Sequence, residues 1–227
     1  LEFRRVLFRS GDRLGYPRSV TGLRGVEDAG LGDIGAKVTA GERLDEQEAL
    51  RLFHCPDLNA VGWLADLSNQ RRNGLRASFI LNRYINYSNY CILSCEFCAF
   101  SRKKRDKDGF ELSVEQMVGK AREALAHGIT ELHIVGGLHP SLPFSYYTGF
   151  LKALRALDPR LQLKCFTAIE VLHLAWLAKK PVPETLAELK AAGLDSLTGG
   201  GAEIFRKEVR SRIARGKESG EIGRAHV

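Results

Sequence analysis

The sequence predicts an α/β fold, a (β/α) barrel of the TIM type represented by about its first four βα units behind a short helical segment. Two observations predict it. From residue 77 onward, strand-like apolar runs alternate with helical runs, as in a parallel sheet whose strands are joined by helices. The chemically unusual residues then follow the carboxyl ends of several expected strands, where a barrel builds its site. A doubly wound sheet shares the periodicity but gathers such residues at one switch point, so the barrel is favoured.

The segment before the barrel, residues 11–75, is expected to be a leader followed by helices. Asp45 and Glu48 have the spacing of a capping box, in which each side chain bonds a backbone N–H of the other residue. A second amphipathic run ends at Gly74, and glycine is common just beyond a helix. Residues 11–30 are rich in glycine and arginine without clear periodicity, which indicates a leader or untranslated DNA.

The barrel segment, residues 76–220, contains the alternating runs. Ser113 and Gln116 form a capping-box pattern at the start of its best-defined helix, which Gly128 ends. Four strands are too few to close an eight-stranded barrel. We therefore expect an exposed sheet edge and no turnover by this fragment alone. The strands are expected at 77–88, 129–137 and 161–170, with a short fourth strand that runs into a glycine-rich turn within 194–203. The helices are expected at 112–128, 145–159 and 182–193.

Both ends of the chain differ from their surroundings. One short DNA sequence, read on its two strands, encodes both Arg-Val-Leu-Phe-Arg-Ser, found at residues 5–10, and Ile-Gly-Arg-Ala-His-Val, found at residues 222–227. We therefore interpret residues 1–10 and 221–227 as translated sequencing adapter. Such segments are excluded from reasoning about the fold.

The composition limits the classes of function. The net charge is +7, but basic residues are interspersed with acidic ones and no nucleic-acid-binding motif is present, so nucleic acid is not the expected partner. No apolar run approaches the roughly 20 residues that span a bilayer. We therefore expect a cytoplasmic location without a membrane partner. There cysteines stay reduced, and clustered ones indicate metal ligands or catalytic groups.

Three of the five cysteines, Cys91, Cys95 and Cys98, have the spacing C-x3-C-x2-C in the stretch "YCILSCEFCAF". A disulfide would leave one thiol over and suits a different compartment. Structural zinc usually takes four ligands; Cys55 and Cys165 are candidates for the fourth, but each is better explained as a small buried apolar residue. An iron–sulfur cluster normally takes four cysteines, so three leave one iron open to another ligand.

This cysteine motif, in the loop after the first strand of a barrel, resembles that of the radical S-adenosylmethionine (SAM) superfamily. The resemblance implies that the three thiolates hold a [4Fe–4S] cluster whose unique iron binds SAM. It implies that one electron then cleaves SAM to a 5′-deoxyadenosyl radical. It also places Phe97 near the adenine and the pair Gly136-Gly137 beside the methionine ammonium, where small residues permit close backbone approach.

Further stretches narrow the resemblance. "CEFCAFSR" is similar to the branch that holds the menaquinone futalosine-pathway enzymes and the deazaflavin F0 synthase subunits. Within it, "ELHIVGGLHPSLPFSYY" and "LDSLTGGGAEIFRKEVR" most resemble the aminofutalosine synthase family. That family's reaction adds the adenosyl radical to 3-[(1-carboxyvinyl)oxy]benzoate and consumes SAM, as a transferase of menaquinone biosynthesis. The implied partners are this aromatic dicarboxylate and a low-potential electron donor such as flavodoxin or ferredoxin.

Two alternatives stay open. One is a sister radical SAM enzyme, either a cyclic dehypoxanthine futalosine synthase or a deazaflavin F0 synthase subunit. The other, from a different class, is a zinc-stabilised module that binds nucleic acid. Colour distinguishes the second from the first, because an anaerobically prepared cluster protein is brown and a zinc protein is colourless.

Several polar residues are candidates for this site. Glu170 and Glu203 are expected at the ends of the third and fourth strands, where they bond SAM or transfer protons, or else face solvent as loop carboxylates. His133, on the second strand, points either into the barrel or away from it. The substrate's two carboxylates require a cation. Arg83 and Arg102 are candidates, although the basic run around Arg102 has the composition of a solvated loop.

Overall fold

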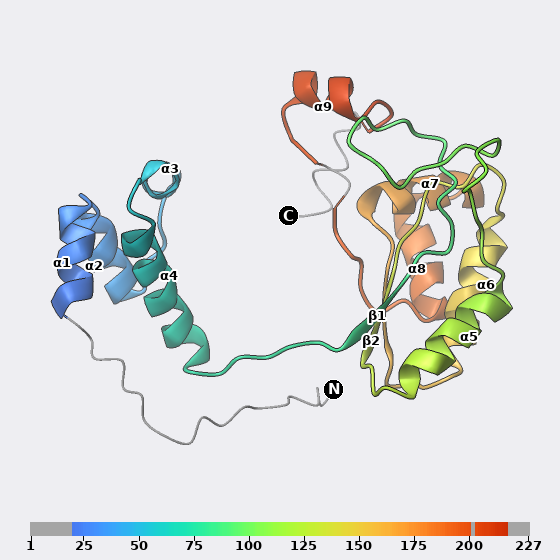
Figure 1. The fold of residues 1–227 in the computed structure, drawn as a ribbon, viewed down its shortest axis with the longest axis horizontal. Helices are drawn as coiled ribbons and strands as arrows, with labels where there is room; N and C mark the ends of the chain where they lie inside the picture. The colour runs from blue at the N-terminus through green and yellow to red at the C-terminus, as the bar shows by residue number, and fades with distance from the viewer. Residues whose placement is uncertain (1–19, 201–202, 218–227) are drawn as a thin grey trace. The chain divides into compact units, whose positions relative to one another are not determined.

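A computed structural model describes residues 20–200 and 203–217, and Figure 1 shows its ribbon. The segments interpreted as adapter, residues 1–10 and 221–227, lie outside the described residues. The chain divides into two compact units between Phe79 and Ile80.

The first unit is helical in its described part. The predicted capping box is confirmed, because the Asp45 N–H donates to Glu48 Oε2 and the Glu48 N–H donates to Asp45 Oδ1, both at 2.8 Å. The buried core residues come from three of the helices and one connection, and they are Val26, Leu31, Ile34, Ala60 and Leu64. The helices are α1 (Val20–Asp28), α2 (Gly32–Ala40), α3 (Glu46–His54) and α4 (Leu58–Asn73).

The helical structure begins earlier than the sequence predicted. Residues 11–30 were expected to form a leader, but α1 begins at Val20. A Cβ atom on Gly22 would lie 2.2 Å from Trp63 Nε1, so this glycine permits close packing of α1 on α4. Because glycine lowers helix propensity, a position that serves helix packing in this way weakens the helical pattern in the sequence.

The second unit is built on a parallel sheet of β1 (Asn82–Ile85), β2 (Glu131–Ile134) and β3 (Gln162–Cys165), in the order β1-β2-β3. The helices α5 (Val114–Leu125), α6 (Phe144–Arg155) and α8 (Val182–Ala192) lie on one side of it (Figure 1). Sequential strand order with these helices on one face is the arrangement of a barrel, whereas a doubly wound sheet carries helices on both faces. The predicted α/β part-barrel is confirmed.

Alternation along the strands separates the two faces of this sheet. On β2 and β3 the face toward the helices is apolar and buried, and the capping box predicted at Ser113 and Gln116 begins α5 beside it. The opposite face, which would be the barrel interior, carries Tyr84, His133 and Lys164 at paired positions. The buried core includes Ile85, Met117, Ala121, Leu132, Ile134, Phe150, Leu151, Leu154, Leu163 and Cys165.

The short fourth strand predicted within 194–203 lies beside β3 but extends over too few residues to form a full strand in its described part. It pairs with β3 through a bridge between Lys164 and Ser196, and beyond the bridge the Thr198 N–H donates to the Phe166 carbonyl at 2.9 Å. Gly199 and Gly200 then have positive φ of 72° and 80°, which agrees with the glycine-rich turn predicted after this strand. Glycine is the residue that adopts this backbone region without strain.

The predicted third strand is shorter than expected, because β3 ends at Cys165 and helix α7 (Ala168–Ala178) follows. Thr167 is the N-cap of α7 and forms a capping box with Glu170. Glu170 therefore lies in the first turn of a helix, and its predicted position at the end of a strand is wrong. Helix α9 (Lys207–Ile213) lies near the end of the described chain. None of the helices in residues 20–200 and 203–217 is long and apolar enough to cross a bilayer.

Candidate functional site

The loop between β1 and α5 carries Cys91, Cys95 and Cys98 as free, half-buried thiols. The Cys98 N–H donates to the Cys95 carbonyl at 3.1 Å and closes a tight turn. The Ile92 N–H donates to the Leu138 carbonyl at 2.9 Å and ties the loop to the segment after β2. Backbone hydrogen bonds thus hold this loop, and the thiols are available as metal ligands.

The glycine pair after β2 lies directly against the cysteine loop. A Cβ atom on Gly137 would lie 2.2 Å from the Tyr90 carbonyl oxygen and 3.0 Å from Cys91 Cβ. A Cβ atom on Gly136 would lie 2.6 Å from the ring of Tyr87. These glycines are therefore needed for packing against the cysteine loop, in addition to the approach to SAM that the resemblance implies.

Glu170 is 2% exposed and accepts hydrogen bonds on both carboxylate oxygens. Its Oε1 accepts from the Tyr87 hydroxyl at 2.8 Å and from the Gly136 N–H at 3.0 Å. Its Oε2 accepts from the N–H and the hydroxyl of Thr167, both at 2.7 Å. Burial raises the pKa of Glu170, and the hydrogen bonds from Thr167, Tyr87 and Gly136 oppose the rise. Glu170 is therefore not a solvent-facing carboxylate: it fixes the glycine turn, and its role in catalysis stays a prediction.

Glu203 forms an ion pair with Lys217, whose Nζ donates to Glu203 Oε1 at 2.8 Å. The Lys217 side chain is only 9% exposed, and its Nζ lies 5.4 Å from the centroid of the Phe97 ring. Burial raises the pKa of the Cys95 thiol, and the nearby Lys217 charge opposes the rise. Lys217 thus brings a positive charge to the cysteines, which the sequence analysis did not predict.

These groups line one cavity, bounded by the cysteine loop, the turn after β2, the start of α7 and the Glu203–Lys217 pair. His133 is not among the described residues that line it. It lies on β2 beside Tyr84, with ring centroids 5.2 Å apart, and its catalytic role stays a prediction. The predicted site residues that line the cavity are Cys91, Cys95, Phe97, Cys98, Gly136, Gly137, Glu170 and Glu203.

Neither arginine considered for the substrate is among the described residues that line the cavity. Arg83 is exposed on β1. Arg102 is bonded within its own loop, because its guanidinium donates to Asp108 Oδ2 at 2.6 Å and to the Ala99 carbonyl at 2.7 Å. Arg102 therefore stabilises its own loop in this structure.

The two remaining cysteines lie outside the cavity. Cys165 is fully buried in β3, and burial raises its pKa well above the ordinary value. Cys55 is half-buried and packs against the core of the first unit. Both residues thus contribute apolar packing, as expected.

Several residues that support the site were not predicted from the sequence. Thr167 was detectable, because Thr167 and Glu170 have capping-box spacing. Tyr87 carried no local signal, because its partner Glu170 is 83 residues away. Lys103 was hidden in a basic run, yet its Nζ donates to the Cys91 carbonyl at 2.9 Å.

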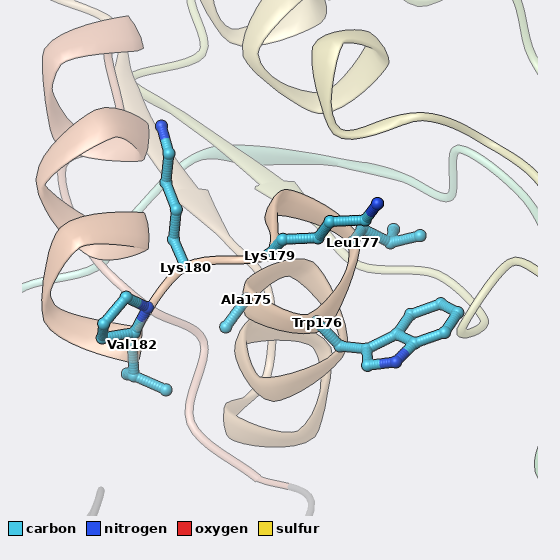
Figure 2. A pocket seen from close by; sticks show the side chains of 7 residues that line it. Ala175, Trp176, Leu177, Lys179, Lys180 and Val182 are labelled. Carbon is cyan, nitrogen blue, oxygen red and sulfur yellow. The ribbon is translucent and has the colours of Figure 1, made fainter.

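A second hollow lies at the end of α7 and the start of α8 (Figure 2). Trp176 is 70% exposed there, and Figure 2 shows Lys179 and Lys180 on the segment between the two helices. Among the described residues that line this hollow there is no cysteine, histidine or carboxylate. It therefore offers no metal ligand of these types, and the cysteine-lined cavity is the candidate site.

The three thiols fit the protein ligands that a cluster requires. Within the described part of the chain, no three Cys, His, Asp or Glu side chains are grouped to hold one ion. Tetrahedral zinc requires such convergence. A [4Fe–4S] cluster requires less, because each thiolate binds a different iron. Three half-buried thiols on one cavity wall therefore fit a cluster with one open iron.

Known proteins are similar to this chain in sequence. The chain is 43% identical over 187 residues to aminodeoxyfutalosine synthase from Streptomyces coelicolor, covering 82% of this chain and 48% of the relative. It is 38% identical over 199 residues to aminodeoxyfutalosine synthase from Thermus thermophilus, covering 88% and 54%. It is 36% identical over 199 residues to cyclic dehypoxanthine futalosine synthase from Streptomyces coelicolor, covering 86% and 50%. The chain spans about half the length of these curated relatives.

A solved structure shares the fold. The FeFe-hydrogenase maturase HydG from Carboxydothermus hydrogenoformans superimposes with a TM-score of 0.63 at 21% identity, covering 88% of this chain and 44% of that one. Residues 85–223, more than half of the chain, match the family described as the Radical SAM superfamily, and this range contains the three cysteines. The chain therefore belongs to the radical SAM superfamily.

Proposed function

We propose that the protein is an aminodeoxyfutalosine synthase, which joins the adenosyl group of SAM to 3-[(1-carboxyvinyl)oxy]benzoate. The observation that carries the proposal is the cavity in which the C-x3-C-x2-C thiols face the glycine turn, Glu170 and Lys217. The two relatives named aminodeoxyfutalosine synthase, at 43% and 38% identity, support this choice of reaction.

The three thiolates would hold the cluster, which supplies the electron that cleaves SAM when it is bound and reduced. The chain's own residues would position the reactants. The glycine turn lets backbone approach closely, and Glu170 holds that turn through the Gly136 N–H. Phe97 is 50% exposed beside the cysteines and offers a ring face to the adenine. Positioning of this kind is what a protein adds when a cofactor carries the difficult step.

Lys217 is suited to binding a carboxylate in this cavity. An ammonium group has three N–H donors, and Glu203 accepts one of them at 2.8 Å. Both SAM and the proposed substrate carry carboxylates. Within the described residues that line the cavity, Lys217 is the only basic side chain, so we assign it to a carboxylate of one reactant.

A sister reaction of the same branch is the second candidate. The chain is 36% identical to cyclic dehypoxanthine futalosine synthase from Streptomyces coelicolor and 37% identical to FO synthase from Streptomyces avermitilis. The candidates differ in the fate of the adenosyl group, which stays bonded to the product in the first reaction and leaves as 5′-deoxyadenosine after hydrogen abstraction in the sister. All of them require a low-potential electron donor such as flavodoxin or ferredoxin.

The test uses the full-length protein, reconstituted with iron and sulfide without oxygen. Dithionite, SAM and the enolpyruvyl benzoate are added, and the adenosyl products are identified by mass spectrometry. A covalent adenosyl–benzoate adduct is the expected result. Free 5′-deoxyadenosine alone would exclude the adding reaction and favour a sister enzyme, and an iron-loaded sample that leaves SAM intact would contradict the assignment of the cysteines.

A matched pair of cysteine variants controls this experiment. Cys98→Ala removes a proposed ligand and is expected to abolish the brown colour and SAM cleavage. Cys55→Ala removes a thiol that packs against the first unit, so it is expected to leave both properties intact.

A further inference from the structure

We propose that Lys103 is a positioning residue for the cluster. Its ammonium group holds the cysteine loop in the conformation that presents the thiols, and it places one positive charge against the backbone of the first cysteine. This inference rests on the proposed cluster and is independent of which reaction of the branch the enzyme performs.

The geometry around Lys103 is specific. Its Nζ donates to the carbonyls of Cys91 at 2.9 Å, Ile92 at 3.3 Å and Leu93 at 2.7 Å. An ammonium has three donors, so each one has an acceptor. Three successive carbonyls converge on one atom only where the backbone curls around it. Lys103 therefore determines the course of the chain from the first cysteine ligand toward the second.

The lysine is itself held in place. Its backbone N–H donates to Asp106 Oδ2 at 2.6 Å, and its side chain is partly buried. The neighbouring lysine has a different role, because Lys104 Nζ pairs with Glu111 Oε2 at 2.9 Å and lies over the Tyr90 ring. Lys107 is exposed on the same loop and serves as a matched control. Of these three lysines, Lys103 is therefore the one whose ammonium group is bonded to the backbone of the cysteine motif.

Two consequences follow for a cluster bound by these cysteines. Hydrogen bonds that involve an ionised group are stronger than neutral ones, so the loop is ordered before iron arrives. The charge also acts on the cluster, because net charge and local hydrogen bonding set the reduction potential of an iron–sulfur centre. A nearby cation favours the reduced form, which carries one more electron. Loss of the Lys103 charge therefore makes the cluster harder to reduce.

The first test compares Lys103→Met with Lys107→Met in the full-length protein before iron is added. Amide hydrogen exchange is measured for Cys91, which donates to the Arg102 carbonyl, and for Ile92, which donates to Leu138. Lys103→Met is expected to speed exchange at both amides about tenfold, which corresponds to about 1.4 kcal/mol of local opening free energy. Exchange in the buried part of α6 is expected to stay as in the wild type, which separates loop opening from unfolding.

The second test loads the same variants with iron and sulfide and measures the reduction potential by redox titration followed with electron paramagnetic resonance. Lys103→Met is expected to shift the potential to more negative values and Lys107→Met to leave it within error. Lys103→Arg keeps the charge but not the convergent donors, so the potential is expected to return while part of the fast exchange remains. Equal exchange rates and equal potentials in Lys103→Met and Lys107→Met would overturn the proposal. Both measurements can be made whether or not the adenosyl–benzoate product forms. Failure of the proposed reaction is therefore distinguishable from failure of the Lys103 proposal.

Discussion

The sharpest structural prediction concerns Gly137, where the space for a single methyl group is missing. In Gly137→Ala the new Cβ atom would lie 2.2 Å from the Tyr90 carbonyl oxygen and 2.8 Å from its carbonyl carbon. Ordinary contact begins near 3.4 Å, so the two segments must separate by roughly an ångström. Because the obstructing atoms are backbone, no side-chain rotation relieves the clash. Backbone shifts of this kind cost about 1–3 kcal/mol, and we expect the upper half of that range.

The same shift moves Cys91, whose Cβ lies 3.0 Å from the added atom. Gly137→Ala is therefore expected to lower both the free energy of unfolding, measured with urea, and the iron bound per protein after reconstitution. Gly119→Ala is the control, because Gly119 is exposed in α5 with no neighbouring atom within 4 Å of the added Cβ. Alanine is favoured there by about 0.5–1 kcal/mol, so the control has the opposite sign. Wild-type stability and full iron content in Gly137→Ala would refute the close approach.

The remaining predictions concern the charged groups of the site. Glu170→Gln places an amide N–H₂ group against donors that now bond a carboxylate oxygen of Glu170. The substitution is expected to lower the free energy of unfolding, measured with urea, by about 2 kcal/mol. An unchanged free energy would contradict the hydrogen bonds assigned to Glu170. Burial raises the folded-state pKa of Glu170, so its contribution to stability is present below the unfolded pKa of about 4.3 and is lost as pH rises through the folded pKa. The stability difference between wild type and Glu170→Gln is therefore expected to shrink as pH rises from about 4, and a constant difference from pH 4 to 8 would refute this sign. Lys217→Met is expected to raise the KM for SAM or for the benzoate about tenfold with unchanged iron content, and steady-state kinetics with unchanged KM for both would exclude its role.

Local patterns in the sequence predicted the local structure well. The capping boxes at Asp45 and Ser113 each involve residues three positions apart, so the sequence contains both partners side by side. The capping box at Thr167 was equally local but was overlooked, because it directly follows the apolar residues of β3. The pattern that begins a helix was therefore assigned to the strand. As a consequence, Glu170 was placed on the wrong element, although its place in the cavity was predicted.

The fourth strand is shorter than an ordinary strand for a different reason. Its sequence has the apolar character of a strand, and one bridge to β3 does form at Ser196. Strand formation depends on partners that lie far away in the sequence, and propensity alone does not supply them. The glycines at 199 and 200 then turn the chain. Glycine composition indicates a turn, but it does not say how early the preceding ladder ends.

The site likewise combines a local sequence motif with contacts between residues that are distant in the sequence. The three cysteines lie within eight residues, so a local motif is enough to predict the cofactor they would hold. The groups that shape the cavity come from separate βα loops: Tyr87 and Glu170 are 83 residues apart, and Gly136 and Glu170 are 34 apart. In a barrel enzyme the choice of substrate depends on such loops, which vary while the scaffold stays the same. The superfamily therefore follows from eight residues, whereas the reaction depends on contacts that form only when the whole barrel is folded around its reactants.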